Sequence, residues 1–259
     1  MHNKPFLLAP KPKSPLRWLL LALAIAAVVA GLLAYDYFFS SKGRWVNYRA
    51  YTQDHQTLAE YRLQPGTRCD GSPFAFPTTG VIFGLWDDSY GLRHRHQGLD
   101  IFAGTQVGAT PIYAAYPGYL TRAADWISTV IIRIPSDPLQ PNRQIWTYYT
   151  HMADKHGASF VSEAFPPGTS EVFVEAGTLL GFQGDYSGDP SNPTGLHLHF
   201  SIVKDDGQGS FLNELEISNT LDPSPYFNLP VNDNQNPVTY PQCAGTTTTQ
   251  NWNLEPEHE

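Results

Sequence analysis

Between residues 81 and 203 the chain is divided into short runs of four to eight residues, with glycines between many of them. The runs are rich in Val, Ile, Tyr, Phe, Trp and Thr, which favour β-strands. No ten-residue helical pattern separates them, so crossover helices between parallel strands are not indicated. We therefore predict a mostly β domain with an antiparallel sheet. The expected strands are residues 81–85, 112–115, 119–123, 128–134, 144–151, 171–175, 179–183 and 196–203.

An uncharged apolar run covers residues 19–34, with Trp18 and Tyr35 on either side of it. A helix over residues 18–35 would extend about 27 Å, near the minimum that crosses a bilayer core. The flanking aromatic residues suit the membrane interface. We predict one transmembrane signal-anchor at residues 18–39, with a cleaved signal peptide as the alternative.

Charge is unevenly distributed along the chain. The formal net charge is −8, and the first 17 residues hold four basic residues and no acid, which leaves −12 for the rest. This bias modestly favours a cytoplasmic tail at residues 1–17 and a C-terminal part outside the cell membrane. An acidic chain without a long basic run is not typical of nucleic-acid binding.

A pair of histidines falls in the last expected strand, in the sequence GLHLHF at residues 195–200. Side chains two apart on a strand face the same side, so His197 and His199 share a face while Leu198 and Phe200 point to the core. Such a pair suits metal binding from a rigid element, although two histidines on a strand are equally common on a polar surface.

A second group, RHQGLDI at residues 95–101, supplies further ligand types. His96 and Asp100 are four residues apart, so an extended segment puts them on one face, with Gly98 between them leaving room for an ion. Two histidines and one carboxylate are a standard ligand set for catalytic zinc, with a fourth position open. We predict that His96, Asp100 and His199 bind one Zn²⁺ per chain.

His151 lies at the end of the expected strand 144–151. Alternation puts it on the same side as Tyr149, and we expect it to project into the cleft that holds the other histidines. An imidazole titrates near neutrality, so it can accept a proton from water and return it to a leaving amine. His197 and His151, which are outside the ligand set, suit such tasks.

Several segments together resemble the lysostaphin-like (LytM-type) zinc metallopeptidases, in the same order. They are RHQGLDIFA at 95–103, TPIYAAYPGYL at 110–120, YYTHM at 148–152, VEAGTLLGFQG at 174–184 and TGLHLHFSI at 194–202, with LDPSPYFNL at 221–229 as the usual end of that domain. The resemblance implies a lysostaphin-like, lipoyl-hybrid-like sheet and a peptidoglycan endopeptidase. It also implies that His96, Asp100 and His199 bind zinc, that His197 is the general base, and that His151 orients the water or stabilises the oxyanion.

The predicted organisation has five parts. They are a basic cytoplasmic tail at 1–17, the signal-anchor at 18–39, a stalk or linker at 40–73, the zinc metallopeptidase domain at 74–229 and a C-terminal polar tail at 230–259 that wraps the domain or is partly disordered. The loop-like segments 154–170 and 186–192 are expected to line the groove. Export makes a disulfide between Cys69 and Cys243 plausible, with two buried free thiols as the alternative.

The predicted function is a membrane-anchored, extracytoplasmic zinc endopeptidase whose partners are the lipid bilayer and peptidoglycan peptide. One alternative is a catalytically silent scaffold that regulates cell-wall hydrolases. All three predicted ligands and both additional histidines are present, which disfavours this alternative. The other alternative is a zinc peptidase that acts on a secreted protein or peptide.

Overall fold

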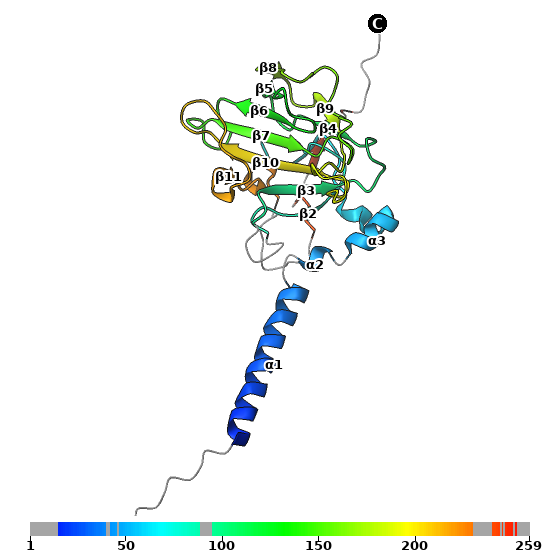
Figure 1. The fold of residues 1–259 in the computed structure, drawn as a ribbon. Helices are drawn as coiled ribbons and strands as arrows, with labels where there is room; N and C mark the ends of the chain where they lie inside the picture. The colour runs from blue at the N-terminus through cyan, green and yellow to red at the C-terminus, as the bar shows by residue number, and fades with distance from the viewer. Residues whose placement is uncertain are drawn as a thin grey trace, which may run out of the picture.

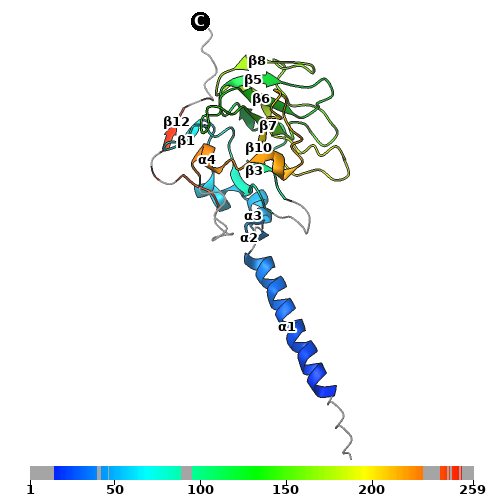
Figure 2. The same cartoon turned by 90° about the vertical axis from the view of Figure 1, so that its left-hand side faces the viewer.

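The computed structural model describes residues 15–39, 42–45, 47–88, 95–229, 240–243, 245, 247–250 and 252. A long helix, α1 (Pro15–Phe39), projects away from a β domain (Figures 1 and 2). Proline at its first position and the many Leu and Ala residues favour this helix. Its part Pro15–Ala34 has a mean hydropathy of 2.4 and is not buried in the protein. This is long and apolar enough for a membrane span, but a signal sequence meets the same criteria, so anchoring stays a prediction.

The β domain is built on an eight-stranded sheet in which all the pairings are antiparallel (Figure 1). The strand order is β2-β3-β10-β7-β6-β5-β8, and the short β11 pairs with β10 beyond the end of β3. Their bounds are β2 (Val81–Gly84), β3 (Gly98–Phe102), β5 (Gly118–Thr121), β6 (Val130–Ile134), β7 (Ile145–Thr150), β8 (Val172–Val174), β10 (Leu198–Lys204) and β11 (Thr220–Leu221). The predicted mostly β, antiparallel fold is confirmed.

The described residues also form two small antiparallel pairs, namely β4 (Pro111–Tyr113) with β9 (Leu179–Phe182) and β1 (Thr67–Cys69) with β12 (Thr247–Thr249). Each of the eight expected runs overlaps one observed strand, and the strand is shorter than the run. β1, β3, β11 and β12 are additional. Three of them have only two or three residues, too few to produce an alternating pattern, and β3 begins at a glycine.

The main core lies on one face of the large sheet. Leu198, Phe200 and Ile202 of β10 point to it, and the ring of Phe200 lies 5.2 Å from that of Tyr149 on β7. Residues of the β4–β9 pair and of the short helix α4 (Ser224–Phe227) pack against them. The alternation predicted for this strand therefore holds, and His199 is left on the opposite face of the sheet.

Three short helices lie between α1 and the β domain: α2 (Lys42–Trp45), α3 (Tyr48–Gln53) and η1 (His55–Tyr61). Their aromatic residues form a second cluster with β2 and β3, made of Trp45, Tyr48, Tyr51, Leu58, Tyr61, Val81, Phe83, Phe102 and Tyr240. The hydroxyl of Tyr51 donates a hydrogen bond of 2.8 Å to the carbonyl of Phe102. Part of the segment predicted as a stalk or linker therefore packs on the sheet, while the five domain boundaries stay predictions.

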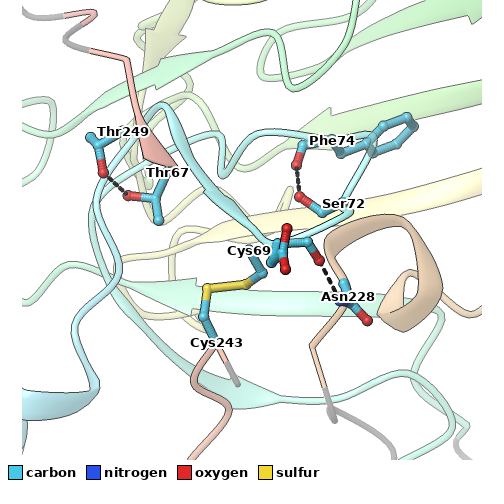
Figure 3. The surroundings of a disulfide bond; sticks show 8 residues. Thr67, Cys69, Ser72, Phe74, Asn228, Cys243 and Thr249 are labelled. Carbon is cyan, nitrogen blue, oxygen red and sulfur yellow. Dashed lines mark hydrogen bonds between the residues drawn. A yellow bond between two sulfur atoms is a disulfide. The ribbon is translucent and has the colours of Figure 1, made fainter. Parts of the chain in front are cut away.

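A disulfide joins Cys69, the last residue of β1, to Cys243, and the two Cα atoms are 5.2 Å apart (Figure 3). Beside it β12 pairs with β1, so that Thr249 lies opposite Thr67. The described residues between 240 and 252 thus wrap onto the β domain. Residues 230–239, 244, 246, 251 and 253–259 of the predicted polar tail lie outside the described residues.

Loss of this disulfide is expected to lower the free energy of unfolding by about 2–5 kcal/mol, because the cross-link restricts a very long loop in the unfolded chain. Urea unfolding of Cys243→Ser, compared with the oxidised wild type, measures the difference. Reductant is the matched control, since it should bring the wild type to the stability of the variant and leave the variant unchanged. Equal stability of the variant and the oxidised protein would contradict the expectation.

Candidate metal centre and active site

The three predicted metal ligands meet where β3 lies beside β10. The register of this pair places Asp100 opposite His199, and His96 comes just before β3. Nε2 of His96 is 3.0 Å from Oδ1 of Asp100, Nδ1 of His199 is 2.9 Å from the same oxygen, and the two nitrogens are 3.1 Å apart. All three residues are buried. Positions about 100 residues apart in sequence therefore converge on one point.

Gly98 has a different role from the one expected. It pairs with Ser201 of β10, and a Cβ atom at this position would lie 2.1 Å from the carbonyl oxygen of Phe200. The interpretation that Gly98 leaves room for an ion is therefore replaced by a close approach of two strand backbones. That approach brings Asp100 to His199.

Hydrogen bonds on the far side of each imidazole set the direction of its lone pair. Nδ1 of His96 lies 2.8 Å from the carbonyl oxygen of Leu85, and Nε2 of His199 lies 2.9 Å from Oε1 of Glu214. A carbonyl and an ionised carboxylate only accept hydrogen bonds, so the far nitrogen of each neutral ring carries the proton. The lone pairs of Nε2 of His96 and Nδ1 of His199 then point at Asp100.

The electrostatics of this cluster favour added positive charge. Burial opposes ionisation of Asp100, yet the nearby imidazoles of His96, His197 and His199 hold the pKa of Asp100 well below its usual value. Burial likewise opposes protonation of His199, but Glu214 and Asp100 together raise the pKa of His199 to about 10.

The donor set fits one divalent cation of the zinc type. The three ligand atoms all lie within 4.8 Å of one another. Ligand atoms about 2.0–2.2 Å from a tetrahedral ion are about 3.3–3.6 Å apart, close to the observed separations. Two imidazole nitrogens and one carboxylate oxygen also match the ligand types of catalytic zinc, which leave one position open for water or substrate.

His197 lies beside this cluster as a buried imidazole. Its Nδ1 is 2.9 Å from the carbonyl oxygen of Gly195, which leaves the Nε2 lone pair facing the site, 3.4 Å from Oδ1 of Asp100. The ring stacks on Phe102 with centroids 4.6 Å apart and an interplanar angle of 18°. Stacking and the hydrogen bond together fix the direction of Nε2.

His151 also lies at this site, but strand alternation does not explain its position. Alternation along β7 would place it with Tyr149, which is in the main core on the other face. The backbone of His151 instead has φ 71°, a left-handed conformation that is costly for a residue other than glycine. The ring consequently lies 4.6 Å from that of His197. The predicted position is therefore reached, but the alternation argument for it is wrong.

The environment of His151 determines its protonation state. Its Nδ1 lies 2.7 Å from the carbonyl oxygen of Tyr186. Burial, reinforced by the imidazoles of His197 and His199, lowers the pKa of His151 to about 3. The ring is therefore neutral at physiological pH, with the proton on Nδ1 and the Nε2 lone pair toward the site.

A cavity of about 400 Å³ opens over these side chains. Besides Asp100 and the four histidines, its lining residues are Gln97, Tyr148, Thr150, Thr194, Glu214 and Leu215. The segments 154–170 and 186–192, expected to line the groove, do not contribute to this lining. The first packs against the main core through Val161 and Phe165, and the second is mostly exposed.

Glu214 is a site residue that the sequence did not indicate. It lies in the loop between β10 and β11, 15 residues beyond His199. No local spacing links a loop carboxylate to a strand histidine at this distance, and only the return of the loop brings the two together.

No protein-family model and no curated protein matches the chain. Among solved structures the chain is similar to Csd3 from Helicobacter pylori, with 20% identity, a TM-score of 0.37 and coverage of 72% of this chain and 37% of that one. It is also similar to a mutant catalytic domain of the prophage-encoded M23 protein EnpA from Enterococcus faecalis, with 24% identity, a TM-score of 0.34 and coverage of 56% and 91%.

The chain therefore spans just over a third of the Helicobacter pylori protein. The Enterococcus faecalis protein is described as an M23 protein. Because the identities are below 25% and the TM-scores below 0.5, we base the function on the geometry of the site.

Proposed function

We propose that this protein is a membrane-anchored zinc metalloendopeptidase that hydrolyses peptide bonds in peptidoglycan stem peptides or cross-bridges. The observation that carries the proposal is the convergence of the ligand atoms of His96, Asp100 and His199 within 4.8 Å, beside two further imidazoles. The choice of peptidoglycan follows from the resemblance of the sequence motifs to LytM-type peptidases. The choice of membrane follows from the length and hydropathy of α1.

In this proposal His96, Asp100 and His199 hold the ion. An ion held there would supply a water with a pKa lowered to about 7 and would polarise the scissile carbonyl. The burial of the three ligands strengthens these interactions, because the charges are poorly screened by solvent.

His197 acts as the general base. Its proton is on Nδ1, which donates to the carbonyl of Gly195, so Nε2 is free to accept the proton of the attacking water. The resulting imidazolium is stabilised by Asp100, whose Oδ1 is 3.4 Å away, and then returns the proton to the leaving amine.

His151 positions the attacking water. In its neutral form the Nδ1 proton is committed to the carbonyl of Tyr186, so Nε2 accepts a hydrogen bond but cannot donate one. This tautomer favours orientation of the water over donation to an oxyanion, the two roles that the family resemblance leaves open.

Digestion of purified peptidoglycan by the full-length protein in detergent tests the proposal. We expect release of soluble muropeptides with new amino termini, which stops with a chelator and returns with added zinc. Zinc binding with cleavage of unfolded protein but not of peptidoglycan would favour a peptidase of secreted proteins. Zinc binding without any cleavage would favour the silent scaffold, and absence of zinc binding would overturn the mechanism.

A further inference from the structure

Glu214, which is not among the predicted site residues, contacts the predicted metal ligand His199 through its carboxylate. We propose that Glu214 is a positioning residue for the metal: its carboxylate accepts a hydrogen bond from the Nε2–H group of His199 and so directs the Nδ1 lone pair at the ion. The contact is 2.9 Å long, on the side of the ring opposite to Asp100. The inference rests on the proposed zinc function and deepens it by assigning part of the metal affinity to a loop.

A comparison of the four imidazoles around the cavity singles out His199. The far nitrogens of His96, His151 and His197 each face a backbone carbonyl, of Leu85, Tyr186 and Gly195 respectively. The far nitrogen of His199 faces a carboxylate instead. A charged acceptor makes a stronger hydrogen bond than a neutral one, and it makes the opposite nitrogen a better electron donor. His199 is therefore the imidazole ligand that this shell strengthens most.

Hydrogen bonds to the residues before and after Glu214 hold this part of the loop in place. The side-chain amide of Gln97, next to His96 in sequence, donates a 3.0 Å hydrogen bond to the carbonyl of Leu215. On the other side, Asn219 donates a 2.9 Å hydrogen bond to the carbonyl of Asn213. The carboxylate itself is only 11% exposed, so solvent screens its contact with His199 weakly.

The charges agree with this assignment. Among the three predicted ligands only Asp100 carries a negative charge. A divalent cation held by this set would therefore keep one uncompensated positive charge in a buried site, and such a charge is costly. Glu214 supplies a second negative charge one imidazole away. Asp100 and Glu214 together then balance the charge of the ion, while the open ligand position stays available for water.

The test compares zinc affinities of the full-length protein and variants in detergent, by competition with a chromogenic chelator at constant pH. Glu214→Ala removes the acceptor, and Glu214→Gln keeps an acceptor of similar size without the charge. We expect a loss of zinc affinity of about 10- to 100-fold for Glu214→Ala and a smaller loss for Glu214→Gln. The matched control is Glu216→Gln, an exposed carboxylate two residues further on, which should bind as the wild type does.

The absorption spectrum of bound Co²⁺ reports the ligands around the ion. A loss of fold stability alone would not shift its d–d bands. We expect altered d–d bands in both Glu214 variants, because the orientation and basicity of one ligand change. If Glu214→Ala fails to fold, Glu214→Gln decides the question. Unchanged zinc affinity and an unchanged Co²⁺ spectrum in the folded variants would overturn the inference while the proposed function stands. Failure of the wild type to bind zinc would instead overturn the proposed function, and this inference with it.

Discussion

Asp100→Ala is expected to abolish both zinc binding and peptide hydrolysis. Asp100 supplies the only carboxylate of the predicted ligand set, and its Oδ1 lies 3.0 Å from Nε2 of His96 and 2.9 Å from Nδ1 of His199. Its removal leaves two neutral ligands. Because a metal contributes several kcal/mol to a hydrolytic transition state, we expect kcat/KM to fall at least about 1000-fold. Muropeptide release and metal content of the purified protein measure the two effects.

Asp189→Ala is the matched control, because Asp189 is an exposed carboxylate in the segment 186–192, outside the cavity. It should retain zinc and activity. Circular dichroism checks that both variants fold. An Asp100→Ala protein that still hydrolyses peptidoglycan, and still stops with a chelator, would show that the ligand set is wrong.

His197→Ala is expected to separate metal binding from turnover. His197 is not in the predicted ligand set, so zinc content should stay near one ion per chain. Loss of the general base should lower kcat by about 100- to 10,000-fold. Single-turnover cleavage of a soluble muropeptide, together with metal analysis, distinguishes the two outcomes.

His156→Ala serves as the control for His197→Ala, since His156 is exposed in a loop and is absent from the cavity lining. It should match the wild type in both measurements. Loss of zinc from His197→Ala would mean that His197 is a ligand, and that the roles of His197 and one of the predicted ligands must be exchanged.

The parts of the site that sequence reasoning placed correctly depend on local geometry. His197 and His199 are two residues apart next to and within β10, and the burial of Leu198 and Phe200 on the other face follows from strand alternation alone. His96 and Asp100 are four residues apart, so the same alternation predicts that they lie on one face. Their convergence with His199 was predicted from the ligand types that zinc takes and agreed with the family resemblance, since alternation says which face a residue occupies but not which strands are neighbours.

The parts that sequence reasoning missed depend on contacts between distant segments. Glu214 reaches His199 through a returning loop, and His151 enters the cavity because of a single left-handed backbone conformation. The packing of α3 on β3, through Tyr51 and Phe102, also leaves little trace in a segment with only a loose helical pattern. None of these is encoded in a local period of hydrophobicity.

The packing of α3 beside the candidate site also limits how far this site can lie from α1. Tyr48 of α3 contacts Phe102, whose ring stacks on His197. Only eight residues separate Tyr48 from Phe39, the last residue of α1, and a fully extended chain of that length covers about 30 Å. With α1 in a bilayer, as proposed, the cavity stays within a short radius of the membrane. The substrate would then be the layer of wall nearest the membrane, and peptides farther out would be cut only after they come within that radius.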